Sequence, residues 1–520
     1  MKPEANSCNS QGVLEKSGVR TSFWDYVSLL SGNLILIPLG IVSVAMTTRI
    51  LGPEGYGYIT IFNFVTTFVV MVTTNWTATS LLRFGREEYD REGKLTHSFW
   101  ARTIILTPCL LIGIAIVYLL RSFINDYMKM PSWAIWLVIA SAFILTARTY
   151  LDYILQAIHH MKAYASTQIV FVAVSIIGLA LILAGFFPKT YLTVIIVGLI
   201  TNAMTLILFC LFLIPPKVVS PVKTDRKMVR EVFSFSYPLL IGNLSAYLVN
   251  WIDVIVIKHF FSMSDVGGYQ LAYNMFNLLG GLVSSVSVLI TPMLVSFLAA
   301  KREDLVLRYS TRIVPQGLLL WATLIGVISG ICPPIFRIIF GQEFSVSIPY
   351  FQFLAIGLAT GGLIYFYSGE ITAYKLIKLA VMASVARGVV NLIGDILFVP
   401  QIGPLGAALS TTGGVTVASL SYLLICQRQL KEKLLWQFIH VLPAVVSVGV
   451  SRISGVPGTP LFAMIATLAS SYYLAKAFHL FRSDDLVILN HIQMPASLKK
   501  TIIWIYPFLT GDAKERARNP

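Results

Sequence analysis

The chain has 520 residues, of which 56% are hydrophobic and only 12% are charged, and its mean hydropathy is +0.76. Soluble domains carry roughly 25% charged residues, so this composition excludes an ordinary soluble protein. The formal charge of +15 is explained by cytoplasmic loops rich in Lys and Arg, as membrane proteins have, and does not indicate a nucleic-acid partner.

Runs of apolar residues predict the membrane crossings, because each helical crossing needs roughly 20 of them. We expect about fourteen spans, at residues 33–46, 59–82, 104–120, 133–155, 166–187, 191–214, 233–257, 269–298, 313–335, 350–373, 379–399, 405–426, 438–450 and 461–478. The expected fold class is an all-α polytopic membrane protein with two parallel six-helix lobes and two C-terminal helices.

A polar stretch with five Lys and Arg residues, 215–232, separates the sixth span from the seventh. We predict a cytoplasmic N-terminal tail (1–22), an N-terminal lobe (23–214), a cytoplasmic linker (215–232), a C-terminal lobe (233–426), two further spans (427–480) and a cytoplasmic C-terminal tail (481–520).

The two halves share a sequence pattern at a spacing of about 211 residues, which indicates an internal duplication. The matches are Gly57-Tyr58 with Gly268-Tyr269, Asn63 with Asn274, Arg91-Glu92 with Arg302-Glu303 and, one residue out of step, Gly32-Asn33 with Gly242-Asn243. A duplicated polytopic unit is typical of transporters. Six spans per half make the repeats parallel, and a cleft between them near the midplane is the expected pathway.

Lys and Arg lie mostly in the loops that are cytoplasmic if the N-terminus is inside. Short loops follow this bias, so we expect a multi-pass plasma-membrane protein with both termini in the cytoplasm.

Ionisable side chains within the spans are the strongest functional signal, because each costs at least roughly 2.5–3.5 kcal/mol at the bilayer centre. They are Arg148, Asp152, Asp253, Glu370, Arg387 and Asp395. Arg148 and Asp152 lie four residues apart, close enough to pair on one helix face, either to lock helices or to serve a cavity. We assign Arg148 and Arg387 to substrate binding and the four acids to ion coupling, with Asp253 a proton or sodium site unless it is only solvated.

Asparagines within apolar runs mostly join helices by hydrogen bonds. The repeat-related pairs Asn33 with Asn243 and Asn63 with Asn274 are better candidates for the cleft, since equivalent positions of two lobes meet across it.

The sequence indicates neither a cofactor nor a metal site. Its five cysteines are scattered without a CxxC pair, and Gly55-Tyr56-Gly57 is not a nucleotide loop, because no strand precedes it. The loops outside the membrane are too short for a catalytic domain, so we do not expect an enzyme.

Several segments in order resemble the polysaccharide-export flippases, the Wzx-like branch of the MOP superfamily. They are residues 48–58 (TRILGPEGYGY), 82–84 (LRF), 237–240 (YPLL), Asp253, Gly268-Tyr269, Pro292 and 398–408 (FVPQIGPLGAA). The resemblance covers about residues 25–478 and implies two six-helix bundles around a central, often cationic cavity. It implies export of a lipid-linked oligosaccharide, typically on undecaprenyl pyrophosphate, with membrane lipid, glycosyltransferases and a glycan polymerase as partners.

Alternative functions remain open at this point. A cation-coupled multidrug antiporter of the same superfamily would depend on Asp152, Asp253 and Glu370 rather than on Arg387. A peptidoglycan-precursor flippase is also close to the pattern. A membrane glycan polymerase or ligase, from a different class, usually places catalytic Arg or His on a long external loop, and a structural scaffold would not explain arginine in mid-span.

Overall fold

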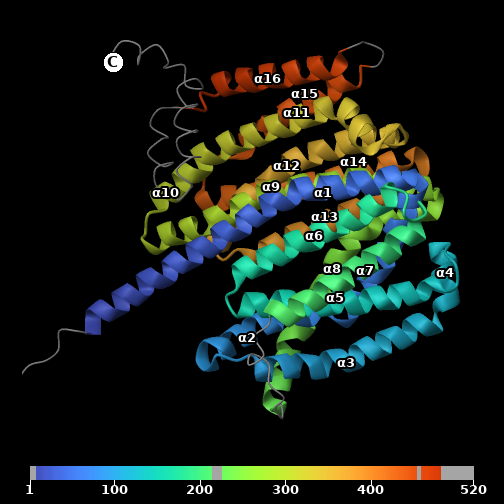
Figure 1. Cartoon of the computed structure of the whole chain (residues 1–520). Helices are drawn as coiled ribbons and strands as arrows, with labels where there is room; N and C mark the ends of the chain where they lie inside the picture. Colours follow the sequence, from blue (N-terminus) through green and yellow to red (C-terminus); the bar gives the residue numbers. More distant parts are fainter. Residues whose placement is uncertain (1–6, 214–224, 454–457, 482–520) are drawn as a thin grey trace, which may run out of the picture. The chain divides into compact units, whose positions relative to one another are not determined.

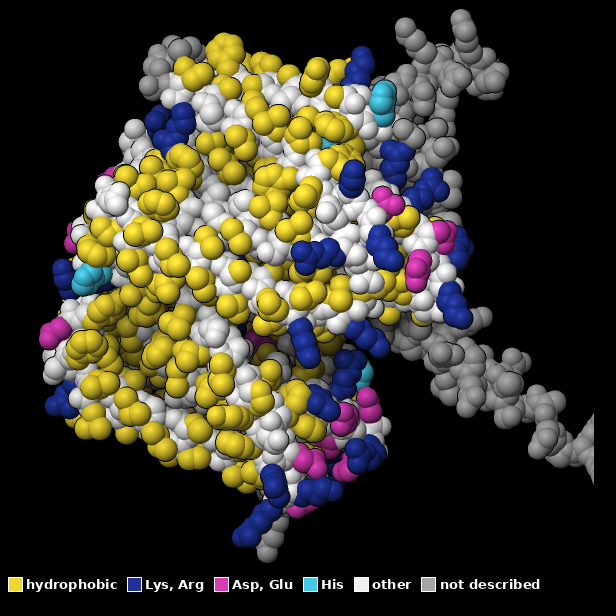
Figure 2. Space-filling view, turned by 180° about the vertical axis from the view of Figure 1, so that it is seen from behind, with side chains coloured by type: hydrophobic (Ala, Val, Ile, Leu, Met, Phe, Trp, Pro, Cys, Tyr) yellow, Lys and Arg dark blue, Asp and Glu magenta, His cyan; other side chains and the backbone are white. Residues whose placement is uncertain are grey.

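Helices joined by short turns make up the chain in the computed structural model. The structure describes residues 7–213, 225–453 and 458–481, with side chains from Ile35 onward except at positions 286, 288 and 289. Eleven helices in these ranges are long and apolar enough to cross a membrane, which confirms the expected all-α polytopic membrane protein. Such helices satisfy their backbone hydrogen bonds internally, as a lipid environment requires. Hydrophobic side chains cover most of the face seen in Figure 2.

The described chain divides into two compact units, and the division falls between Trp251 and Ile252, inside α8. The first unit contains α1 (Ser7–Thr73), η1 (Asn75–Thr77), α2 (Ala78–Glu92), α3 (Thr96–Leu119), α4 (Arg121–Met128), α5 (Ala134–Ala157), α6 (Met161–Leu183), α7 (Tyr191–Leu213) and the first part of α8 (Arg226–Phe260). Helices α5, α6 and α7 pack against α1 and against one another (Figure 1).

Two expected spans, 33–46 and 59–82, lie in the single long element α1, which is broken at Gly52. The backbone of Gly52 has φ 64° and ψ −178°, a conformation essentially restricted to glycine. Pro53 follows and has no N–H to continue the helical hydrogen bonds. The expected loop at 48–58 is therefore reduced to a one-residue break between two helices.

The second span ends earlier than its hydropathy predicts. Thr74 leaves helical geometry (φ −131°, ψ −39°), and the 3₁₀ turn η1 leads into the more polar helix α2. The hydroxyls of Thr73 and Thr74 donate to the carbonyls of Val69 and Val70, four residues earlier. Such bonds compete with the regular backbone pattern and bend helices. Residues 59–82 are therefore not one continuous helix.

The second unit begins within α8. It contains α9 (Met263–Ala299), α10 (Glu303–Arg308), the π-helical turn η2 (Tyr309–Ile313), α11 (Val314–Phe340), η3 (Gln342–Val346), α12 (Ser347–Ala373), α13 (Ile377–Ile402), α14 (Pro404–Leu430), η4 (Leu435–Val441), α15 (Leu442–Ser451) and α16 (Thr459–Ala477). Helix α12 is the most buried of them and packs against α9, α11 and α14.

Helices α13 and α14 approach each other closely because small residues line their interface. A Cβ atom on Gly414 would lie 2.7 Å from the carbonyl oxygen of Arg387, and one on Gly394 would lie 2.6 Å from Ser410 Oγ. This contact holds Asn391 and Asp395, which follow Arg387 on the same face of α13, against α14.

Eleven candidate spans are fewer than the expected fourteen, because α1 holds two expected spans and because α15 and α16 are not among the eleven. Helix α8 starts at Arg226, so the last part of the predicted linker 215–232 is helical. Residues 1–6, 214–224 and 482–520 lie outside the described chain, and the predicted lobe and tail boundaries that fall there stay predictions.

Candidate functional site

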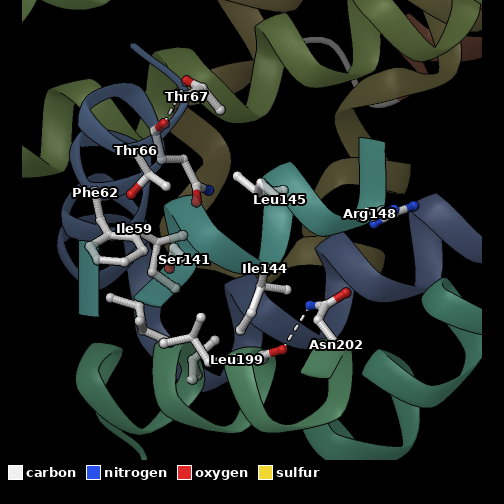
Figure 3. Close-up of a pocket in the computed structure, with 14 residues that line it drawn as sticks. Ile59, Phe62, Thr66, Thr67, Ser141, Ile144, Leu145, Arg148, Leu199 and Asn202 are labelled. Atoms are coloured by element: carbon white, nitrogen blue, oxygen red, sulfur yellow. Dashed lines mark hydrogen bonds between the residues drawn. The ribbon is translucent and has the colours of Figure 1, made fainter. Parts of the chain in front are cut away.

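A cavity of about 220 Å³ lies within the first unit, between α1, α5 and α7. Its polar lining consists of Asn63, Thr66, Thr67, Ser141, Arg148 and Asn202. Arg148 stands at one end of the group, on the same helix as Ser141, Ile144 and Leu145 (Figure 3). Two residues that the sequence predicted for substrate binding, Asn63 and Arg148, therefore line the same cavity.

The Arg148 guanidinium is held on two sides by α6. Its carbon Cζ lies 4.2 Å from the centre of the buried Phe171 ring, and Nη2 donates a hydrogen bond of 2.7 Å to Gln168 Oε1. The same amide donates from Nε2 to Asp152 Oδ1 at 2.8 Å. The sequence spacing allows a direct Arg148–Asp152 ion pair, but no ion pair within 4.0 Å joins these two side chains. Gln168 lies between the two charges instead.

The rest of the cavity offers amides and hydroxyls. Asn202 Nδ2 donates to the carbonyl oxygen of Gly198 at 2.7 Å, and Thr67 Oγ1 donates to the carbonyl oxygen of Asn63 at 2.6 Å (Figure 3). Asn63 itself is exposed. A planar guanidinium beside amides suits phosphate groups and sugar hydroxyls, because it donates several directed hydrogen bonds.

A second polar centre lies within the second unit, around Asp253 of α8. Asp253 is 2% exposed and accepts three hydrogen bonds: Asn391 Nδ2 donates to Oδ1 at 2.7 Å, Thr411 Oγ1 donates to Oδ2 at 2.7 Å, and the Tyr269 hydroxyl also donates to Oδ2. The donors come from α9, α13 and α14. We call these residues, with Asp395, the Asp253 cluster.

Asp395 completes the Asp253 cluster. It is fully buried on α13, one turn beyond Asn391, and lies close enough to Asp253 for the two carboxyl groups to interact. Among the described residues, no donor meets hydrogen-bond geometry at the Asp395 carboxyl oxygens or at the Asn391 amide oxygen, although Ser410 and Asp253 lie beside the Asp395 carboxyl group. Two neighbouring buried carboxylates repel each other strongly. Such a pair therefore shares a proton or binds a cation. Carboxylate, amide and hydroxyl oxygens are also the ligands that hard cations prefer.

Glu370, the third predicted acid of this unit, lies apart from the Asp253 cluster. It is 1% exposed on α12, accepts a hydrogen bond from the Ser310 hydroxyl and interacts with the Cys426 thiol of α14. Ser310 belongs to the π-helical turn η2. Pro315, two residues beyond this turn in α11, lacks the N–H that regular helical bonding needs.

The remaining predicted site residues are distributed over both units. Arg387 is half-buried on α13 of the second unit, within electrostatic reach of Tyr273, whereas Arg148 belongs to the first. Asn274 accepts a hydrogen bond from Gln270 on its own helix. Asn243 lies half-buried on α8 of the first unit, and the side chain of Asn33 lies outside the described part. Their assignment to a shared cleft stays a prediction.

The residues of these sites that were not predicted include Gln168, Tyr269, Asn391 and Thr411. The spacing of Asn391 from Asp395, one turn on the same helix, was an available signal. Gln168 and Thr411 gave none, because single polar residues within apolar runs usually only join helices.

Comparison with known proteins gives a family match and a similar curated protein. The family model described as "Polysaccharide biosynthesis protein" matches residues 24–298, more than half of the chain. The probable low-salt glycan biosynthesis flippase Agl15 of Haloferax volcanii is 27% identical over 191 residues, which are 36% of this chain and 40% of that protein. The alignment thus spans about two fifths of that relative's length.

Solved structures share the fold at low sequence identity. The lipid II flippase MurJ, in an inward closed conformation, has a TM-score of 0.62 and 14% identity, over 89% of this chain and 98% of that chain. A MOP superfamily transporter from Pyrococcus furiosus has a TM-score of 0.53 and 12% identity, over 78% of this chain and 94% of that chain. With the family match, these folds confirm the resemblance seen in the sequence, and the chain belongs to the polysaccharide biosynthesis protein family.

Proposed function

We propose that this protein moves a lipid-linked oligosaccharide, of the undecaprenyl-pyrophosphate type, from the inner to the outer leaflet of the plasma membrane for cell-surface polysaccharide synthesis. The observation that carries the proposal is the cavity of the first unit, where Arg148 stands beside amides and hydroxyls in a chain of this family.

The chemistry of this cavity fits the head group of such a substrate. A pyrophosphate is anionic and a glycan is polar, so both need a protected path through hydrocarbon. Arginine binds phosphate through paired N–H donors, and the amides of Asn63 and Asn202 suit sugar hydroxyls. The polyprenyl tail stays in lipid while the two lobes alternate access.

The Asp253 cluster supports ion coupling as part of this proposal. Its two neighbouring buried carboxyl groups and the amide and hydroxyl oxygens around them suit a proton or a small cation whose gradient drives the cycle. Both termini lie in the cytoplasm in this proposal, and glycosyltransferases and a glycan polymerase act before and after the transport step.

The Asp253 cluster also favours the second candidate, a cation-coupled multidrug antiporter. Such a protein needs acids for its coupling ion and its cationic substrate, whereas it has no use for a half-buried arginine in a cavity. The two functions therefore differ in their dependence on Arg148.

Replacement of Arg148 in a strain that lacks the native copy tests the proposal. Arg148→Ala should lower surface polysaccharide by about tenfold or more, because a hydrogen bond to a charged group is lost, and lipid-linked precursor should accumulate. Arg148→Lys should retain part of the export, since it keeps charge without paired donors. Arg387→Ala, in parallel, tests the second predicted cation.

Arg121→Ala is the matched control, because Arg121 is an exposed residue of α4 outside this cavity. Membrane levels of each variant are compared by immunoblot. Two results together contradict the flippase and support the antiporter. Arg148→Ala exports polysaccharide normally, and loss of the whole protein changes only drug tolerance.

A further inference from the structure

The Gln168 side chain connects two opposite charges that stand one helical turn apart. Its carbonyl oxygen Oε1 accepts from Arg148 at 2.7 Å, and its nitrogen Nε2 donates to Asp152 at 2.8 Å. A carboxamide has one acceptor end and one donor end. Only this orientation of the amide gives Arg148 an acceptor and Asp152 a donor. The two charged neighbours therefore fix the orientation of the Gln168 amide.

This bridge replaces an ion pair that the helix would otherwise allow. Arg and Asp at positions i and i+4 are neighbours on a helix surface and commonly pair. In α5 they do not, and no ion pair within 4.0 Å joins them among the described residues. The two charges are instead separated by the width of one amide, which comes from α6.

The bridge leaves most of the guanidinium available. Nη2 is the one nitrogen of Arg148 with a hydrogen-bond partner among the described residues, and none of its nitrogens is both buried and unpartnered. The Phe171 ring, 4.2 Å from Cζ, supports the plane of the group from one side. Arg148 also lines the cavity and stands at one end of it (Figure 3), so a ligand that extends to this end meets the guanidinium.

We propose that Gln168 is a positioning residue that keeps Arg148 from pairing with Asp152, so that the guanidinium stays available to an anionic phosphate group in the cavity. This inference rests on the proposed function. The competing explanation is a staple, in which the Arg148–Gln168–Asp152 chain only joins α5 to α6.

Replacement of the amide by an apolar side chain of similar size separates the two explanations. Gln168→Leu removes the bridge and lets Arg148 and Asp152 approach each other. We expect export to fall about tenfold at a normal membrane level, with a higher KM for lipid-linked precursor in liposomes and a smaller change in the maximal rate. Gln156→Leu, a half-buried glutamine of α5 with no side-chain hydrogen bond in the described structure, is the matched control.

The double variant Gln168→Leu with Asp152→Asn gives the decisive comparison. Asparagine carries no charge, so Arg148 is free again. Because Asp152 is itself a predicted ion-coupling residue, the double variant is compared with Asp152→Asn alone, and we expect it to reach more than half of that variant's export with a similar KM. A staple predicts no recovery, because the link between α5 and α6 is still missing. A double variant no better than Gln168→Leu alone overturns the proposal.

The single variants separate this inference from the function on which it rests. If Arg148→Ala exports normally, Arg148 does not bind the anionic group and the proposed function itself is contradicted. A defect in Arg148→Ala together with normal export by Gln168→Leu leaves the flippase in place and overturns only the role of Gln168.

Discussion

Asp253 is surrounded by donors from three helices, yet it lies beside a second buried carboxyl group. Tyr269, Asn391 and Thr411 satisfy its oxygens, whereas no donor in the described chain meets hydrogen-bond geometry at the oxygens of Asp395. Buried polar atoms are almost always hydrogen-bonded, so such exceptions are often functional. The arrangement supports the proposal that this site takes up and releases a positive charge.

Neutralising one carboxyl group should uncouple transport from its driving ion. We expect Asp253→Asn to lower gradient-driven export by about tenfold or more, since an amide keeps the shape of the side chain but binds neither a proton nor a cation strongly. Export should be measured in membrane vesicles with an imposed pH or sodium gradient. Asp126→Asn, an exposed residue of α4, is the control. Gradient dependence that survives in Asp253→Asn contradicts the coupling role.

Single residues are also where prediction from the sequence was least complete. Arg148, Asn63, Asp253 and Asp395 were each predicted, because polar groups are costly within apolar spans. Their grouping into two sites was not predicted, since it depends on how α1, α5, α8 and α13 pack. Gln168 was missed because its function depends on two neighbours that only the packing of α6 against α5 supplies.

Helices α13 and α14 position half of the Asp253 cluster through close backbone contact. A methyl group added at Gly414 would lie 2.7 Å from the carbonyl oxygen of Arg387 and 3.5 Å from Asn391 Cβ. The first distance is too short for a side chain without movement of the backbone. The neighbouring Gly413 is more open, because a methyl group there would meet no atom nearer than 3.9 Å.

These two adjacent glycines make a matched pair for a test of helix packing. Gly414→Ala should displace α13 and lower the midpoint of thermal unfolding in detergent by several degrees, since overpacking costs roughly 1–3 kcal/mol. Gly413→Ala should leave the midpoint unchanged or raise it, because alanine favours helix. Equal midpoints for both variants show that the contact between α13 and α14 does not carry stability.

Whole helices were predicted well, because lipid forces each span to be long, apolar and internally hydrogen-bonded. The span expected at 133–155 is α5, Ala134–Ala157, and the one expected at 191–214 is α7, Tyr191–Leu213. The break after Thr73 was missed because hydropathy averages over a window, whereas the break arises from threonine hydroxyls that bond to carbonyls one turn earlier.

The candidate sites of the two units differ in the charged groups that they contain. A cavity with Arg148 lies in the first unit, and the Asp253 cluster and Glu370 lie in the second. The repeated sequence pattern did not predict this asymmetry, because Arg148, Asp253 and Glu370 are not among the repeated residues. We propose a division of labour, in which the first unit binds an anionic head group and the second takes up the coupling ion.

Direct transport by the purified protein tests the central claim. The chain is reconstituted into liposomes that carry a polyprenyl-pyrophosphate-linked oligosaccharide with a fluorescent sugar, and the glycan that reaches the outer leaflet is removed by an added glycosidase. We predict faster exposure with the native chain than with empty liposomes, and a rate close to that of empty liposomes for Arg148→Ala. Native protein that exposes the glycan no faster than empty liposomes, while it carries a lipophilic cation in the same vesicles, would contradict the account.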